Sequence, residues 1–157
     1  MSTRQISIKK GETYLITGGS GFLGKVLTER LIEAGANVRC LARNEGNMMS
    51  LQQTHPVEIS PGDVSDPVDV RQAMKGIKGV FHLAAFKHVG LAEKFSRECI
   101  KSNTIGSLNI LEASLDFPLD FVIGISTDKA AKISGVYGAS KFLMEKLFQQ
   151  FELNNPE

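Results

Sequence analysis

Residues 13–24 read TYLITGGSGFLG, an apolar run that leads directly into a glycine-rich turn. Gly18, Gly21 and Gly24 have the spacing GxxGxxG, between an expected strand over residues 12–17 and an expected helix over residues 22–34. In this context Gly18 lets the chain reverse, Gly21 lets a pyrophosphate approach the backbone, and Gly24 lets the helix pack close to the sheet. The stretch predicts a dinucleotide-binding turn; an ordinary glycine-rich βα turn is the alternative.

The rest of the chain alternates short apolar runs with longer amphipathic stretches. Because strands that alternate with helices form right-handed βαβ units, the pattern predicts an α/β fold with a doubly wound parallel sheet, in the order 3-2-1-4-5. We expect one dinucleotide-binding domain over residues 1–157, the front portion of a longer protein. The further strands are expected at 37–41, 57–60, 79–84 and 119–125, and the further helices at 45–53, 66–76, 91–114 and 138–153.

Charge and composition exclude several classes of function. With 18 Lys and Arg against 17 Asp and Glu, the 157 residues carry a net charge of +1, too little for a nucleic-acid footprint or a polybasic membrane anchor. No apolar run reaches about 18 residues, and MSTRQISIKK at the start lacks the apolar stretch of a secretory signal. Cys40 and Cys99 stand alone, which favours a reducing, cytoplasmic setting. The three histidines share no ligand spacing, so no metal is expected, and His82 is predicted to be a core residue.

The end of the second expected strand indicates which dinucleotide is bound. An acid at this point would bind the 2′-hydroxyl of NAD, but Arg43 stands there, and a guanidinium pairs with a 2′-phosphate. The sequence therefore favours NADP, with NAD possible because Glu45 could supply the acid. Asp63 follows the third strand, where its carboxylate could accept from the adenine amino group or could be a turn residue.

Two pairs of residues near the fifth strand suggest proton transfer. Tyr137 and Lys141 are four apart on an expected helix, and a neighbouring ammonium lowers the pKa of a phenol. Asp128 and Lys129 follow the hydroxyls of residues 126–127 at the end of the strand, where they could act as acid and base on adjacent carbons. An exposed ion pair is the alternative for Asp128 and Lys129.

Together these stretches resemble the extended short-chain dehydrogenase/reductase superfamily. The closer match is to its branch of inverting UDP-N-acetylglucosamine 4,6-dehydratases and related epimerases of polysaccharide biosynthesis. The resemblance runs from about Thr13 to Phe151. It is most specific in LITGGSG (15–21), FHLAAFKHV (81–89), IKSN (100–103), STDKAA (126–131) and YGASK (137–141).

The resemblance implies a role for each site residue. Tyr137, helped by Lys141, would take the proton of the sugar 4-hydroxyl while the C4 hydride passes to the nicotinamide. Lys129 would then remove the C5 proton, Asp128 would protonate the departing 6-hydroxyl, and Thr127 would hydrogen-bond the 4-oxygen. Asn103 would support the site. The expected cofactor-binding residues are Gly18, Ser20, Gly21, Phe22, Leu23, Gly24, Arg43, Asp63, Val64, Ala84, Ala85, Lys87, Tyr137 and Lys141.

Length sets further expectations. Members of the resembled family continue into a C-terminal sugar-binding subdomain, so we expect no sugar-nucleotide turnover by these 157 residues alone. The full-length parent would act on a UDP-N-acetylhexosamine. A homo-oligomer is expected from the open edge of the fifth strand and from the wide apolar face of the last helix, for which core packing against the sheet is the alternative. Two other functions remain open, a non-catalytic dinucleotide-binding sensor and a simple NADP-dependent carbonyl reductase.

Overall fold

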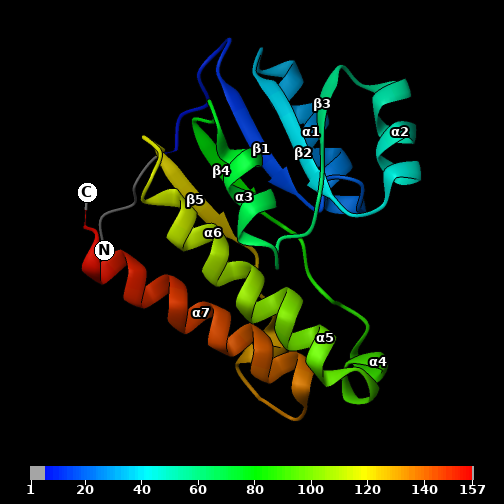
Figure 1. The fold of residues 1–157 in the computed structure, drawn as a ribbon, viewed down its shortest axis with the longest axis vertical. Helices are drawn as coiled ribbons and strands as arrows, with labels where there is room; N and C mark the ends of the chain where they lie inside the picture. The colour runs from blue at the N-terminus through cyan, green and yellow to red at the C-terminus, as the bar shows by residue number, and fades with distance from the viewer. Residues whose placement is uncertain (1–5, 157) are drawn as a thin grey trace.

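A computed structural model describes residues 6–156, so residues 1–5 of the expected leader and Glu157 lie outside the described residues. Five strands form a parallel sheet in the order β3-β2-β1-β4-β5, which confirms the predicted fold (Figure 1). The strands are β1 (Thr13–Thr17), β2 (Asn37–Ala42), β3 (Val57–Pro61), β4 (Gly79–His82) and β5 (Phe121–Gly124).

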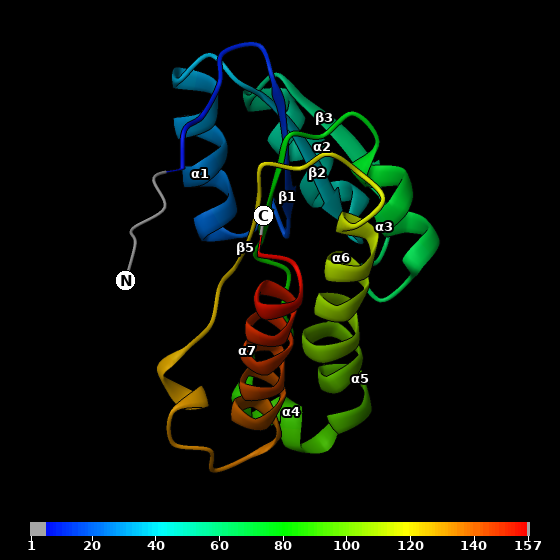
Figure 2. The same ribbon diagram turned by 90° about the vertical axis from the view of Figure 1, so that its left-hand side faces the viewer.

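Helices cover both faces of the sheet, as a doubly wound fold requires (Figure 2). On one face, Leu31 of the first helix and Leu51 of the second pack against Tyr14 and Ile16 of β1. On the other face, helices after β3 and before β5 bury Leu15 and neighbouring side chains. The helices concerned are α1 (Phe22–Glu33) and α2 (Glu45–Thr54) on the first face, and α3 (Pro67–Met74) and α6 (Gly106–Ser114) on the second.

Strand register brings the ends of the central strands to one edge. Thr17, the last residue of β1, pairs with Leu41 of β2 and with His82 of β4. The glycine turn after β1 therefore lies between the loops that leave β2 and β4. This edge is where open parallel sheets bind ligands.

Strand β4 is shorter than predicted. It ends at His82 rather than at Ala84. The Leu83 amide donates to both the backbone carbonyl and the hydroxyl of Thr17, whereas the Ala84 amide donates to the Thr17 hydroxyl, each at 3.1 Å. The chain thus leaves the ladder and turns across the edge of the sheet.

Residues 91–114 are largely helical, as predicted, with an interruption at Phe95 and a change of helix type within the continuous stretch 96–114. The helical segments are α4 (Val89–Lys94), α5 (Ser96–Ile100), a π-helical turn η1 (Lys101–Ile105) and α6. The last helix, α7 (Val136–Asn154), begins two residues earlier than predicted and runs beside α5 and α6 (Figures 1 and 2). Tyr137 therefore lies in its first turn.

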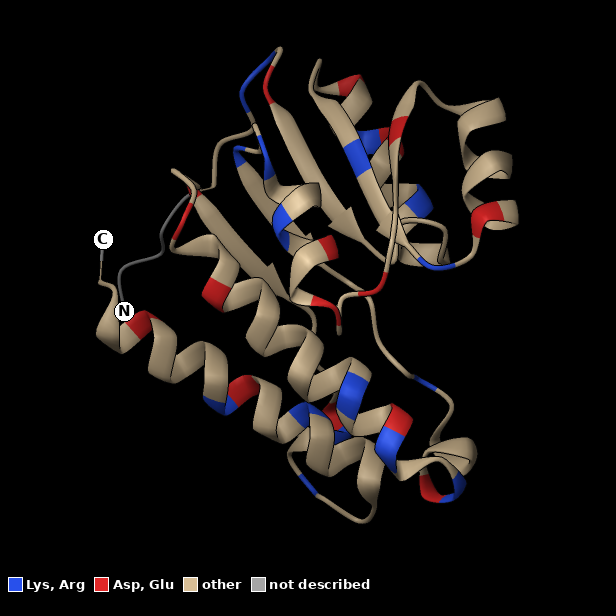
Figure 3. Ribbon diagram, in the orientation of Figure 1, with Lys and Arg blue, Asp and Glu red and all other residues tan. Residues whose placement is uncertain are grey.

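Acidic and basic residues are interspersed over the described part of the chain (Figure 3). Within residues 6–156, no helix is long and apolar enough to cross a membrane. The same residues hold no cluster of three or more metal-ligating side chains. Cys40 and Cys99 are free and buried, and His82 is buried as predicted.

Candidate functional site

The turn between β1 and α1 depends on glycine at two positions. Gly18 has a φ of 72°, and a Cβ there would lie 2.9 Å from the backbone nitrogen of Ala84. A Cβ at Gly24 would lie 2.6 Å from the carbonyl oxygen of Gly19. Glycine at these positions therefore lets the turn, the β4 loop and α1 approach one another closely.

Helix α1 begins with backbone amides that its own hydrogen bonds do not use. The first four N–H groups of an α-helix lack intrahelical acceptors, and Gly21 at the N-cap offers no side-chain acceptor. Phe22, Leu23 and Gly24, the first residues of the helix, all line a pocket. Because the N-terminal end of a helix carries partial positive charge, these amides can bind a phosphate.

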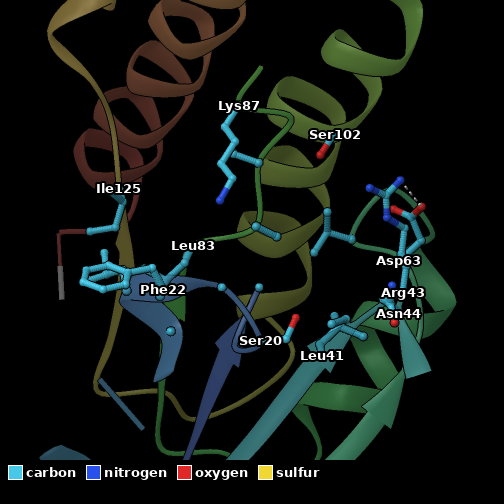
Figure 4. Close-up of a pocket in the computed structure, with 18 of the residues that line it drawn as sticks. Ser20, Phe22, Leu41, Arg43, Asn44, Asp63, Leu83, Lys87, Ser102 and Ile125 are labelled. Atoms are coloured by element: carbon cyan, nitrogen blue, oxygen red, sulfur yellow. Dashed lines mark ion pairs between the residues drawn. The ribbon is translucent and has the colours of Figure 1, made fainter. Parts of the chain in front are cut away.

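The pocket has a volume of about 450 Å³ and opens over the carboxyl edge of the sheet (Figure 4). The ends of β1 to β4 and the start of α1 contribute to its wall. Most of the residues predicted to bind the cofactor lie in this wall: Gly18, Ser20, Gly21, Phe22, Leu23, Gly24, Arg43, Asp63, Val64, Ala84, Ala85 and Lys87.

Arg43 and Asp63 face each other at one end of the pocket (Figure 4). The guanidinium Nη1 lies 3.7 Å from a carboxylate oxygen of Asp63. Burial works to raise the pKa of Asp63, but two hydrogen bonds from Ser65 and the charges of Arg43 and Lys101 together hold it below its ordinary value. Glu45, the alternative acid, does not line the described pocket, so the charged groups at this end are Arg43 and Asp63.

The loop after β4 brings Lys87 to the opposite side, with its amine directed into the pocket (Figure 4). Buried Asn103 of η1 fixes this loop: its side chain accepts from the Phe86 amide at 2.7 Å and donates to the Phe86 carbonyl at 3.0 Å. The same amide nitrogen donates to the hydroxyl of Ser140 on α7 at 3.0 Å. Asn103 thus ties the pocket loop to the helix that carries Tyr137 and Lys141.

Lys141 lies next to a residue of the pocket wall but does not line the described pocket itself. Its side chain is buried, and its Nζ donates at 2.5 Å to the carbonyl oxygen of Ile125, a residue that lines the pocket. Burial lowers the pKa of Lys141 to about 8, although Glu145 and Cys99 act in the opposite direction. Tyr137 is half-buried one helical turn away. Neither Tyr137 nor Lys141 contributes to the wall of the described pocket.

Thr127, Asp128 and Lys129 lie on the loop between β5 and α7. The last two belong to a 3-10 turn, η2 (Asp128–Ala130), for which Thr127 is the N-cap. Asp128 accepts from the Thr127 hydroxyl at 3.0 Å and pairs with the Lys129 amine at 3.4 Å, with 87% of its side chain exposed. The Thr127 hydrogen bond and then the Lys129 charge lower the pKa of Asp128. None of the three lines the described pocket.

Sequence reasoning missed several residues that line the pocket. Most of them flank strand ends that were identified, so the βα alternation could have indicated them. Ser102 is different, because it comes from a helical segment that carries no strand-end signal. The missed residues are Leu41, Ala42, Asn44, Gly62, Leu83, Ser102 and Ile125.

The parallel sheet in this order, with its glycine turn at the start of α1, defines a Rossmann-type dinucleotide-binding fold. The family model described as polysaccharide biosynthesis protein matches residues 14–157. The chain belongs to this family.

Individual proteins of known sequence or structure are also similar to this chain. Over 143 residues the chain is 36% identical to the inverting UDP-N-acetylglucosamine 4,6-dehydratase of Campylobacter jejuni, covering 88% of this chain and 43% of that one. The X-ray structure of Pen from Bacillus thuringiensis superposes with a TM-score of 0.91 at 30% identity, covering 94% and 47%.

A third match extends the likeness in fold. The UDP-glucose 4-epimerase of Bifidobacterium longum, solved with NAD⁺ and UDP, gives a TM-score of 0.83 at 22% identity, covering 92% of this chain and 50% of that one. The chain spans about half the length of the curated relatives that it matches.

Proposed function

We propose that residues 1–157 form the nicotinamide-dinucleotide-binding domain of a nucleotide-sugar dehydratase or epimerase in polysaccharide biosynthesis. The observation that carries this proposal is the pocket in front of the glycine turn, where the first amides of α1 line the wall. Membership of the polysaccharide biosynthesis family and the likeness to a 4,6-dehydratase support the substrate class.

The residues that line the pocket suit the chemistry of a dinucleotide. Gly18 and Gly24 keep side chains out of the turn, and the amides of α1 face the position of a pyrophosphate. The NAD⁺ held by the epimerase of the same fold supports the nicotinamide class. A bound nicotinamide dinucleotide would supply the chemistry of accepting a hydride from a sugar carbon and returning it.

We favour NADP over NAD because the cation of Arg43 stands at the end of β2. Its side chain is 66% exposed and makes only a loose ion pair with Asp63, so a 2′-phosphate could bind it without breaking a strong contact. Asn44 and the first turn of α2 lie beside it and add the positive end of a second helix.

Tyr137 and Lys141 are proposed to transfer the proton of the sugar hydroxyl. At neutral pH Lys141 is mostly an ammonium despite its lowered pKa, so it can supply the cation of this pair one helical turn from Tyr137. The hydrogen bond from Lys141 to Ile125, a residue of the pocket wall, supports this role.

Asp128 and Lys129 are proposed to act as acid and base in the elimination, with Thr127 on the sugar 4-oxygen. The lowered pKa of Asp128 makes it a carboxylate at neutral pH, which is the wrong form for an acid. Bound sugar would therefore have to replace the Thr127 and Lys129 contacts and remove Asp128 from water. This pair favours a dehydratase over a simple reductase or a sensor, neither of which needs it.

For the whole protein we propose a UDP-N-acetylhexosamine substrate, a homo-oligomer and a cytoplasmic location. Absence of turnover by these 157 residues alone stays a prediction. It is tested by incubating the purified chain with UDP-N-acetylglucosamine and following consumption of the sugar nucleotide.

Calorimetric titration with NADP⁺ and NAD⁺ tests the role of Arg43. We expect the wild type to bind NADP⁺ more tightly, and Arg43→Ala to weaken NADP⁺ about tenfold or more while leaving NAD⁺ nearly unchanged. Arg30→Ala, which removes an exposed arginine of α1 outside the pocket wall, is the matched control. Equal binding of both dinucleotides by the wild type would remove the role given to Arg43.

A further inference from the structure

Helix α7 holds the loop that leaves β5 at two successive residues. Lys141 donates to the carbonyl oxygen of Ile125, and the hydroxyl of Ser126 donates to a carboxylate oxygen of Glu145, both at 2.5 Å. Lys141 and Glu145 are four residues apart, so both side chains leave the same face of α7. One contact fixes the backbone of the loop and the other fixes a side chain.

This loop has few other anchors before η2. The backbone amide of Ile125 donates to the carbonyl of His82 at 3.2 Å, and Thr127 then turns its hydroxyl to Asp128. Ser126 lies between them and is exposed. Its hydroxyl is occupied by Glu145, so Ser126 is a point of attachment and not a free group facing the pocket.

We propose that Glu145 is a positioning residue, whose carboxylate holds Ser126 and stands beside Lys141 so that the loop of Thr127, Asp128 and Lys129 and the Lys141 amine keep their places at the pocket. The proposal rests on the function proposed above, because that function gives these residues their roles. No part of it requires Glu145 to touch substrate or cofactor.

Glu145 also acts on the charge of Lys141, together with the other titratable groups around this lysine. His82 of β4, Cys99 of α5 and Glu145 of α7 are the titratable groups that act on Lys141 or respond to it. Burial, together with the Lys141 charge, lowers the pKa of His82 to about 3, so His82 is neutral at ordinary pH. Cys99 is a buried thiol. Glu145 and Cys99 both favour the Lys141 ammonium, and Glu145 has the larger effect of the two.

A titration of Lys141 tests the charge effect. In the cofactor-free chain, labelled with ¹³C at lysine Cε, Lys141 is assigned by the signal that disappears in Lys141→Arg, and it should titrate near 8. Glu145→Gln keeps an acceptor for Ser126 but removes the charge, and should move this midpoint down by about 0.3 pH unit or more. Glu145→Asp should restore much of the shift. Glu152→Gln, on an exposed residue of the same helix, is the matched control. An unchanged midpoint in Glu145→Gln would overturn the charge effect.

A second variant tests the attachment of the loop. Ser126→Ala removes the hydrogen bond and leaves the carboxylate, so amide hydrogen exchange at residues 125–129 should accelerate while Lys141 titrates as in the wild type. Unaltered exchange there would overturn the positioning role. Both NMR results are independent of dinucleotide binding. A wild type that binds neither NADP⁺ nor NAD⁺ would therefore refute the proposed function. The Lys141 titration and the amide exchange test only the positioning role of Glu145.

Discussion

His82 shows how a single buried residue joins the parts of the site. Its Nδ1 lies 2.7 Å from the hydroxyl of Thr17, and its Nε2 lies 3.0 Å from the hydroxyl of Ser107. The Ser107 hydroxyl donates to the Asn103 carbonyl, so it can only accept from the ring, and Nδ1 must accept from Thr17. A neutral imidazole with the proton on Nε2 satisfies every member of this chain.

The neutral state of His82 predicts a dependence of stability on pH. Burial lowers its folded pKa from 6.5 to about 3, so on acidification the unfolded chain takes up a proton that the folded chain refuses. Stability should therefore fall as the pH drops from about 6.5 toward about 3, by up to about 1.4 kcal/mol per pH unit from this residue. Urea unfolding of the wild type and of His82→Gln checks this, since the variant should have a shallower slope between about pH 6.5 and about pH 5. Identical slopes would show that His82 titrates normally in the fold.

At the scale of elements, α7 depends on a cap from another helix. The carboxylate of Glu93 on α4 accepts from the backbone amide of Val136 at 2.7 Å. Gly135, the N-cap of α7, has no side chain to offer, and a Cβ there would collide with Glu93. The helix that carries Tyr137 is thus capped by a carboxylate 43 residues away in the sequence. This contact is consistent with α7 starting earlier than predicted.

We expect Glu93→Ala to destabilise the start of α7. Loss of the cap should cost about 1 kcal/mol and accelerate amide exchange in the first turn, including Tyr137. Glu93→Gln keeps an oxygen acceptor and should retain part of the stability. Glu98→Ala, on an exposed acid of α5, is the control. First-turn exchange as slow in Glu93→Ala as in Glu98→Ala would count against the cap.

The π-helical turn η1 is a local feature that the sequence pattern did not predict. The sequence predicts that residues 91–114 are largely helical, and nothing in IKSNTIG (100–106) marks a wider turn. The turn coincides with Asn103, whose side chain reaches both Phe86 and Ser140. These partners lie 17 and 37 residues away, so local propensity does not report them.

At the scale of the whole molecule, the sequence was sufficient to predict the sheet and most residues of the pocket wall. Alternating elements determine a right-handed parallel order, and the glycine spacing marks the strand end where the pocket forms. Arg43 and Asp63 follow neighbouring strands, so their meeting could be predicted. The contacts of Lys141 with Ile125 and of Ser126 with Glu145 could not, because they depend on how α7 returns to the sheet.

The open edge of β5 bears on self-association. Among the described residues, β5 pairs with β4 alone, and an apolar groove beside it includes Phe117, Phe148 and Phe151. An uncovered edge next to apolar side chains favours pairing between copies. Light scattering should show a mass that rises with protein concentration for the wild type and rises less for Phe151→Glu. A monomeric mass at every concentration would remove this expectation.

The central claim is that a dinucleotide pyrophosphate binds the backbone at the start of α1, and calorimetry on glycine variants tests it most directly. Gly21 has a φ of −74°, and an added Cβ would meet only the Gly18 carbonyl, at 3.3 Å, so Gly21→Ala should fold while placing a methyl group where the phosphates approach. Gly90→Ala, on α4 with no atom within 4 Å of the added Cβ, is the control. We predict dinucleotide binding by the wild type and Gly90→Ala, weakened about tenfold or more in Gly21→Ala at nearly unchanged thermal stability. Equal binding by all three proteins, or none by the wild type, would contradict the account.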